Sequence, residues 1–357
     1  MSNETIVIIG AGVLGLSTAL HLQETLTPRP NLLIIAQYAP GDESIDYATP
    51  WSGAHYRPIP DSSPQGLFEA SLAEKTYAHF KTYALTYPEA GIRFMPGVEM
   101  LESPPAAYLN LDGRYSAIDD FRVLGKEELA AGAEWGASYT TYCVNTPVYI
   151  AHLLRRYLLN GGLIVKKRVA GIEDAFAVAG ARDGSGPVRT VVNCSGTAMG
   201  LVKDPKCFVT RGQTCLVTNA APAPSTQTRQ NSDGTWTFVI PRPLHGGTII
   251  GGTKEERDME DRPRAETRRV LLEKAAKAFP ELLDATGRWE VVRDIVGRRP
   301  SREGGMRVES EEVARGRTVV HAYGAGGRGV EISRGVAELV GELVGKGWGK
   351  KSERAKL

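Results

Sequence analysis

The sequence predicts an α/β protein, and three features near its start predict this class. Residues 6–9 are four consecutive β-branched residues, typical of a central parallel strand buried on both faces. Residues 10–15, Gly-Ala-Gly-Val-Leu-Gly, match the spacing G-x-G-x-x-G, and residues 16–22 continue with helical periodicity. A second apolar strand is expected at residues 32–36. Strand, glycine turn and helix in this order predict a Rossmann-type unit that binds a nucleotide.

The glycines of this turn have separate expected roles. Gly10 permits the tight turn, Gly12 lets the backbone approach a pyrophosphate at the helix N-terminus, and Gly15 brings helix and strand close together. The alternative is a plain strand-to-helix turn without a ligand. Gln37 ends the second strand, where an NAD-binding protein usually has a carboxylate for the ribose hydroxyls, and this difference argues against a simple NAD site.

Composition and charge exclude several classes of protein. The chain has 357 residues, of which 42% are hydrophobic, and a net charge of +2, so a dominant nucleic-acid or anionic-membrane surface is not expected. No apolar run reaches the ~20 residues of a membrane-spanning helix, and no signal peptide is expected at the N-terminus. The 4 cysteines form no C-x-x-C pair, which predicts a reducing compartment and no metal site. Partners are therefore expected to be small molecules.

Motifs spread along the chain carry a family resemblance. Residues 46–55, Asp-Tyr-Ala-Thr-Pro-Trp-Ser-Gly-Ala-His, resemble the flavin-binding loop of the D-amino-acid oxidase family. Further matches occur, in the family's order, at residues 191–196, 211–214, 240–243, 251–253, 296–300 and 321–324. The resemblance covers nearly the whole chain. It implies noncovalent FAD as cofactor, a D-amino acid as substrate and oxygen as electron acceptor.

The resemblance also implies which residues contact FAD. Val169 is expected to meet the adenine through its backbone, and a second glycine cluster at residues 324–329, followed by a helix at 331–344, suits the flavin end because backbone N–H groups can stabilise charge on the reduced ring. A packed glycine-rich turn is the alternative for this cluster. The expected cofactor contacts are Gly10, Ala11, Gly12, Val13, Leu14, Gly15, Gln37, Trp51, Ser52, Gly53, Ala54, Val169, Ser195, Gly196, Gly326, Gly327, Arg328, Gly329, Val330 and Glu331.

These segments lie at the start, middle and end of the chain, so a discontinuous FAD-binding domain is expected. We assign it residues 1–60, 140–205 and 295–345. An interleaved substrate domain, by resemblance an antiparallel sheet, takes residues 61–139 and 206–294, with strands at 237–240 and 248–251. Residues 264–277 are expected to form a charged amphipathic helix. Residues 346–357 form a C-terminal tail.

The substrate pocket is expected around Arg299. It occupies the family position whose guanidinium forms a fork with the substrate α-carboxylate, a geometry suited to two parallel hydrogen bonds. Phe238 stands where relatives usually have a tyrosine whose hydroxyl helps to hold that carboxylate, so this hydrogen bond is absent. Lys254 follows Gly-Gly-Thr, where D-aspartate oxidases have an arginine, and it favours an acidic substrate side chain. The alternative is that Lys254 extends into water among neighbouring charges.

Two charged residues of the second glycine cluster complete the predicted catalytic set. Arg328 and Glu331 belong to the segment that lines the amino side of the substrate in relatives. Glu331 could accept a hydrogen bond from the substrate amino group, or it could pair with Arg328 or Lys254. Both outcomes remain open from the sequence.

The leading interpretation is an FAD-dependent D-amino-acid oxidase that prefers D-aspartate and D-glutamate. Alternatives are oxidation of neutral D-amino acids or of amines such as glycine and sarcosine, an NAD-dependent dehydrogenase, and a flavin-binding protein without catalytic activity. Ala355, Lys356 and Leu357 resemble the Ser-Lys-Leu peroxisomal signal, which predicts binding to an import receptor and a peroxisomal location, beside catalase. The alternative is a frayed polar tail, and the sequence leaves a homodimer open.

Overall fold

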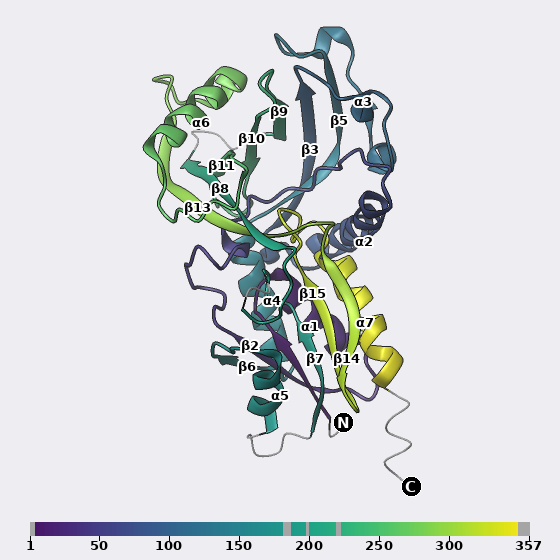
Figure 1. Cartoon of the computed structure of the whole chain (residues 1–357). Helices are drawn as coiled ribbons and strands as arrows, with labels where there is room; N and C mark the ends of the chain where they lie inside the picture. Colours follow the sequence, from purple (N-terminus) through teal and green to yellow (C-terminus); the bar gives the residue numbers. More distant parts are fainter. Residues whose placement is uncertain (1–3, 181–186, 198–199, 219–222, 349–357) are drawn as a thin grey trace.

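The computed structural model describes residues 4–180, 187–197, 200–218 and 223–348. Two sheets divide these residues into a lower and an upper body in Figure 1, and the chain passes between the bodies several times. The α/β class predicted from the sequence is confirmed. The predicted peroxisomal signal, Ala355, Lys356 and Leu357, lies outside the described residues. No helix in the described ranges is long and apolar enough to cross a membrane.

The lower body is a six-stranded sheet in the order β14-β15-β7-β1-β2-β6. All neighbours pair in parallel except β14 and β15, which are antiparallel. Its strands are β1 (Thr5–Ile9), β2 (Asn31–Ala36), β6 (Leu163–Lys166), β7 (Val188–Asn193), β14 (Arg307–Ala314) and β15 (Arg317–Tyr323). Segments from the beginning, middle and end of the chain therefore lie side by side.

Helices cover both faces of this sheet, which explains the continuous apolar run in β1. Ile6 and Ile8 face the larger core beneath α1 (Val13–Thr25), α4 (Thr146–Leu159) and α7 (Ser333–Trp348). Val7 and Ile9 face the opposite core, which α5 (Ile172–Gly180) covers. Successive residues of a strand point to opposite faces, so a strand between two helical layers is apolar at every position.

The upper body is a nine-stranded sheet with the order β12-β8-β11-β10-β9-β3-β5-β4, in which β13 also pairs with β8. It is antiparallel except for the parallel pair β3 and β9, so the predicted antiparallel sheet has one parallel contact. Its strands are β3 (Ile92–Leu101), β4 (Arg122–Val123), β5 (Trp135–Val144), β8 (Cys207–Thr218), β9 (Thr226–Gln230), β10 (Trp236–Pro241), β11 (Thr248–Gly251), β12 (Glu255–Glu256) and β13 (Glu290–Arg302).

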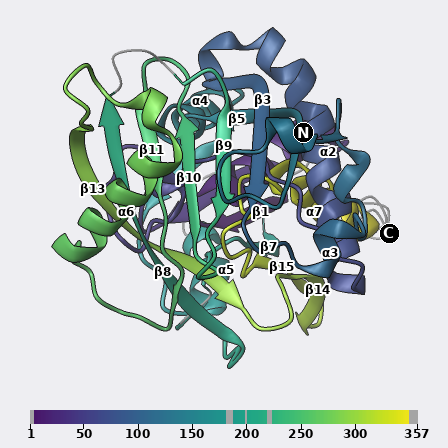
Figure 2. The ribbon, with the colours of Figure 1, turned by 90° about the horizontal axis from the view of Figure 1, so that it is seen from above.

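Three more helices flank the sheets. The predicted charged helix is α6 (Ala265–Ala278), which lies over β8, β10 and β11 (Figure 2) and buries Leu271 and Ala275. Helix α2 (Pro64–Thr86) packs against α7, and α3 (Ala106–Leu109) is a single turn. Two of the proposed domain boundaries, residues 140 and 295, fall inside β5 and β13 of the upper sheet. Each strand begins before the proposed boundary and continues beyond it, so the upper sheet crosses both positions.

Candidate active site

A cavity of about 960 Å³ joins the two bodies. Its walls come from the turn between β1 and α1, the loop that contains the short 3₁₀ helix η1 (Thr49–Trp51), strands β8, β10 and β13, and the turn that precedes α7. This volume is at the upper end of the roughly 300–1,000 Å³ that small-molecule and cofactor sites occupy. The cavity is therefore large enough for a cofactor and a small substrate, and its lining residues come from segments far apart in the sequence.

The turn at the start of α1 is built as the sequence predicts. Gly10 has φ +102, a left-handed conformation that favours glycine, and a Cβ there would lie 2.4 Å from the carbonyl oxygen of Cys194. A Cβ on Gly15 would lie 2.0 Å from the carbonyl oxygen of Gly10, which keeps helix and strand close. Gly12 caps α1 without a side-chain hydrogen bond, and the N–H of Val13 donates to the hydroxyl of Thr49 at 3.2 Å. Within the described residues, the N–H of Leu14 at the cavity wall has no protein acceptor and is open to an anion.

Most of the predicted cofactor contacts line this cavity. Those that do are Gly10, Ala11, Gly12, Val13, Leu14, Gln37, Trp51, Ser52, Gly53, Ala54, Val169, Ser195, Gly196, Gly326, Gly327, Gly329, Val330 and Glu331. Gly15 and Arg328 do not line it. The glycine turn, the N-terminus of α1 and the second glycine turn fit a dinucleotide whose ring gains charge on reduction, so the residues present fit FAD.

Arg242 holds the loop that contains Trp51 and Ser52. Its Nε donates to the carbonyl of Gly53 at 2.7 Å, and its Nη2 donates to the carbonyls of Ser52 at 2.6 Å and Pro50 at 3.2 Å. Burial, with a smaller contribution from the charge of Arg293, lowers the pKa of Arg242 to about 10. Arg242 therefore shapes one wall of the cavity by fixing backbone carbonyls.

Arg299 lines the cavity, as the sequence predicts. Its Nη1 donates to the carbonyl oxygen of Thr253 at 3.0 Å and to that of Arg211 at 3.3 Å. Within the described residues, Nε and Nη2 have no protein acceptor. Burial lowers the pKa of Arg299, and the charge of Glu255 opposes that shift. A guanidinium stays protonated in proteins, so Arg299 presents an unpaired, positively charged edge to the cavity.

Glycine at position 212 allows Arg299 to lie against β8. A Cβ on Gly212 would lie 2.3 Å from Nη1 and 2.5 Å from Nη2 of Arg299, and Gly212 is paired with Gly297 across β8 and β13. The sequence analysis noted the segment Arg-Gly-Gln-Thr but gave Gly212 no role. The signal that could have revealed it is a glycine inside a strand, which often marks a close approach by another group.

Phe238 and Thr214, to which the sequence analysis gave no role, form the wall beside Arg299. The Phe238 ring packs on Gly251 and Gly252, next to the side chain of Thr214. Thr214 is 8% exposed, lines the cavity, and its hydroxyl has no hydrogen-bond partner within the described ranges. Because the Thr214 hydroxyl oxygen is itself buried, it does not replace the hydroxyl that Phe238 lacks.

His55 stands on the same wall, with its ring 6.4 Å from that of Phe238. Its Nδ1 lies 2.6 Å from the hydroxyl of Thr226, which donates its own hydrogen to the carbonyl of Val239. The hydroxyl must therefore accept from Nδ1–H, which leaves Nε2 as an acceptor. Burial, with a smaller contribution from Arg57, lowers the pKa of His55 to about 3, so the imidazole is neutral.

Glu331 lines the cavity, and Arg328 lies behind it. Arg328 Nε donates to Glu331 at 3.1 Å, and Nη1 donates to Glu69 at 3.0 Å. Of the alternatives predicted for Glu331, the structure shows the ion pair with Arg328. Burial raises the pKa of Glu331, while Arg328 opposes the shift. The prediction that Arg328 itself contacts the ligand is not supported, because two carboxylates occupy its guanidinium.

Lys254 does not line the cavity, which contradicts its predicted place in the substrate pocket. Its side chain is 77% exposed, and Nζ pairs with Glu256 at 3.1 Å. The cause is the alternation of an extended segment: Thr253 and Glu255 point toward β8, so Lys254 and Glu256 point to solvent. In the described part of the chain, no group of three His, Cys, Asp or Glu residues could hold a metal ion.

Comparison with known proteins finds relatives along nearly the whole chain. The chain is 47% identical to a D-aspartate oxidase from Talaromyces thermophilus, over 95% of this chain and 94% of that protein. It is 34% identical to a D-amino-acid oxidase from Schizosaccharomyces pombe, over 93% of each. Glycine oxidase from Geobacillus kaustophilus shares the fold, with a TM-score of 0.73 and 19% identity over 96% of this chain and 95% of that chain.

A further solved structure and a family model complete the comparison. L-proline dehydrogenase from P. horikoshii has a TM-score of 0.74 and 15% identity, over 99% of this chain and 98% of that chain. At such low identities the two solved structures establish the shared fold only. The model described as FAD dependent oxidoreductase matches residues 5–343. The chain therefore belongs to the FAD dependent oxidoreductase family, and its cofactor is FAD.

Proposed function

We propose that this protein oxidises D-amino acids with an acidic side chain, D-aspartate first, to 2-oxo acid and ammonia. The observation that carries the proposal is the 47% identity, over 95% of the chain, to a protein named D-aspartate oxidase. The cavity geometry at Arg299 supports it. When bound, FAD supplies the two-electron acceptor that removes a hydride from the α-carbon, and oxygen takes these electrons to give hydrogen peroxide.

Arg299 binds the substrate α-carboxylate in this proposal. Its Nη1 is held by the carbonyls of Thr253 and Arg211, so the Nε and Nη2 edge is the one that faces the ligand. Two parallel N–H donors match the two oxygens of a carboxylate. The partial burial of Arg299 lowers the local dielectric constant and so strengthens the charge-assisted hydrogen bonds. Arg299 thereby fixes the substrate while its α-carbon reacts.

Glu331 and His55 offer acceptors to the substrate amino group. Glu331 is buried at the cavity wall with its charge balanced by Arg328, and His55 Nε2 is an acceptor on the wall that also contains Phe238. An ammonium group is a donor only, so it needs acceptors of this kind. Arg299 and these acceptors together orient a molecule that has both a carboxylate and an amine.

Reduction of the bound FAD tests the proposed reaction. Without oxygen, we expect D-aspartate to bleach the absorbance band of the oxidised flavin at about 450 nm, and L-aspartate, the matched control, to leave it unchanged. Faster bleaching by D-alanine than by D-aspartate would keep the D-amino-acid oxidase activity and overturn the acidic preference. A yellow protein that no D-amino acid bleaches would instead indicate a flavin-binding protein without this activity.

Because Lys254 points to solvent, we expect its replacement to leave activity nearly unchanged. We expect Lys254→Met to change kcat/KM for D-aspartate by less than about twofold, because exposed ion pairs such as that with Glu256 contribute about 0–1 kcal/mol. Steady-state kinetics with D-aspartate and D-alanine measure this. A loss of more than tenfold that is confined to D-aspartate would return Lys254 to the substrate pocket.

A neutral D-amino acid is the second candidate substrate. The observation in its favour is that Lys254, the cation predicted to pair with an acidic side chain, points to solvent, whereas the wall beside Arg299 carries Phe238, Ile240 and Ile249. The comparison of D-aspartate with D-alanine decides between these candidates. Peroxisomal import through Ala355, Lys356 and Leu357, and assembly as a homodimer, stay predictions from the sequence.

A further inference from the structure

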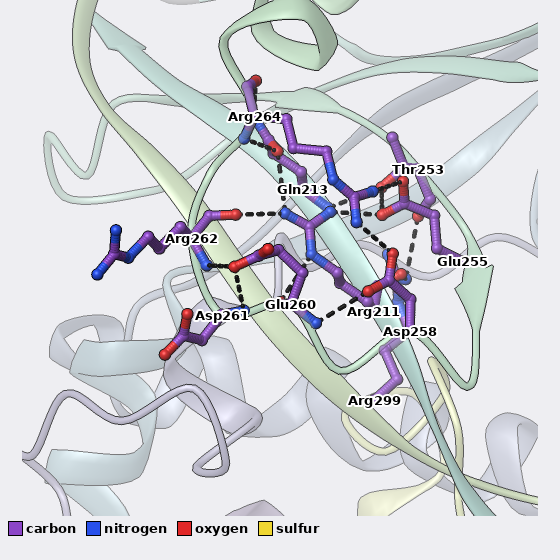
Figure 3. Close-up of polar contacts among 10 residues, drawn as sticks. All are labelled: Arg211, Gln213, Thr253, Glu255, Asp258, Glu260, Asp261, Arg262, Arg264 and Arg299. Atoms are coloured by element: carbon purple, nitrogen blue, oxygen red, sulfur yellow. Dashed lines mark hydrogen bonds and ion pairs between the residues drawn. The ribbon is translucent and has the colours of Figure 1, made fainter.

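A cluster of hydrogen-bonded residues lies behind Arg299 and is centred on a second arginine, Arg211. It forms where residues 253–264, between β11 and α6, fold around the guanidinium of Arg211, whose side chain is 0% exposed (Figure 3). Arg211 Nε donates to the carbonyl of Glu260 at 2.9 Å, and Nη2 donates to that of Arg262 at 2.7 Å. Its Nη1 pairs with the carboxylate of Glu255.

The carboxylate of Glu255 contacts three other residues of this cluster. One carboxylate oxygen takes Nη1 of Arg211 and also accepts from the hydroxyl of Thr253 at 3.2 Å. The other oxygen accepts from Nη1 of Arg264 at 2.8 Å. Figure 3 shows this carboxylate between the two guanidinium groups, with Thr253 beside it. Removing Glu255 would therefore leave a fully buried guanidinium without its counter-charge, which is far more costly than losing an exposed pair.

Gln213 fixes the same segment from β8. Its backbone N–H donates to the hydroxyl of Thr253 at 2.8 Å, and its side-chain amide bonds both the N–H of Arg264, at 2.8 Å, and the carbonyl of Arg264, at 2.9 Å. The two ends of the 253–264 segment are thus attached to one strand. Hydrogen bonds from Gln213 and to Glu255 therefore fix the position of Thr253, including its carbonyl group.

The carbonyl of Thr253 is the link to the substrate site. It accepts from Nη1 of Arg299 at 3.0 Å, and the backbone carbonyl of Arg211, the centre of the cluster, accepts from the same Nη1 at 3.3 Å. Both hydrogens of Nη1 are therefore directed away from the cavity. Because a guanidinium is planar and rigid, the hydrogen bonds at Nη1 also fix the orientation of the opposite edge, formed by Nε and Nη2.

We propose that Glu255 and Arg211 are positioning residues that set substrate affinity: they hold the carbonyls of Thr253 and Arg211 on Nη1 of Arg299 and so aim its free edge at the ligand carboxylate. The inference rests on the proposed role of Arg299. Neither Glu255 nor Arg211 touches the ligand, since neither side chain lines the cavity. Their effect reaches the ligand through the orientation of Arg299.

The test compares Glu255→Ala with Glu256→Ala. The control removes the same charge from the next residue of β12, where Glu256 is 54% exposed and pairs with Lys254. We expect Glu255→Ala to raise KM for the D-amino acid by about tenfold to a hundredfold, the usual cost of misplacing a binding group by ~1 Å. KM should rise more than kcat falls, because the carboxylate contact exists in the bound substrate as well as in the transition state.

A ligand that cannot be oxidised gives a second readout. Malonate, a dicarboxylate without an amino group, should bind the FAD-loaded Glu255→Ala variant about tenfold to a hundredfold more weakly by calorimetry, whereas Glu256→Ala should bind it as the unmodified protein does. Glu255→Gln keeps an acceptor for the Thr253 hydroxyl and should recover part of the affinity. If Glu255→Ala does not fold, Thr253→Val, which removes only the hydroxyl between Gln213 and Glu255, should weaken malonate in the same direction.

A double-mutant cycle separates this inference from the role of Arg299 itself. In an Arg299→Lys background, Glu255→Ala should change malonate affinity by less than about twofold, because residues that act through one another are not additive. An equal loss in both backgrounds, or unchanged affinity in Glu255→Ala alone, would overturn the positioning role. Unchanged affinity in Arg299→Lys alone would instead overturn the proposed carboxylate site.

Discussion

Replacing Arg299 with methionine is expected to reduce kcat/KM for D-amino acids more than any other single change at the cavity wall. Methionine has similar length but no charge, so the substrate carboxylate would be buried without a partner. Truncating one member of a buried, hydrogen-bonded charge pair costs about 2–5 kcal/mol, which corresponds to roughly 30-fold to 4,000-fold in affinity. Steady-state kinetics on FAD-loaded protein measure the loss.

Two further variants define the cause of that loss. Arg299→Lys keeps the charge without the fork, so it should recover part of the activity. Arg269→Lys, on the exposed face of α6 where Arg269 pairs with Glu266 and Glu273, is the matched control and should be neutral. If Arg299→Met retains FAD and full kcat/KM, the substrate carboxylate binds elsewhere in the cavity.

The local parts of the fold were predictable because their causes are local. The strand at residues 6–9, the glycine turn and the following helix depend on neighbouring residues, and the structure places β1 and α1 there. The apolar run in β1 correctly predicted a strand covered on both faces, since Ile8 and Val7 belong to different cores. Arg299 was predictable because its motif is intact, and its position in the cavity agrees.

Lys254 shows where this kind of prediction fails. A motif position gives the residue type but not the side on which an extended segment exposes it. The cluster around Arg211 draws Glu255 inward, and this pairing depends on strands β8 and β12, whose residues 211 and 255 are far apart in the sequence. The position of Thr214 beside Phe238 could not be predicted for the same reason.

The second large effect is expected at Gly15, through the cofactor rather than the substrate. In Gly15→Ala the new Cβ would lie 2.0 Å from the carbonyl oxygen of Gly10 and 3.5 Å from the side chain of Cys194. The first contact is with backbone, which cannot move aside cheaply, so α1 must shift away from β1. Overpacking of this kind costs about 1–3 kcal/mol, occasionally more. The shift would also displace the N-terminus of α1, which would hold the FAD pyrophosphate.

We therefore expect purified Gly15→Ala to have lost most of its bound FAD and to unfold at a lower temperature. The ratio of flavin to protein absorbance after gel filtration measures the first effect, and thermal unfolding measures the second. Gly345→Ala is the matched control, because Gly345 lies on the exposed side of α7 and its Cβ would meet nothing within 4 Å. Alanine there should hold or raise stability, by about 0.5–1 kcal/mol at most. A Gly15→Ala variant as yellow and as stable as this control would mean that close packing of α1 on β1 is not what holds the cofactor.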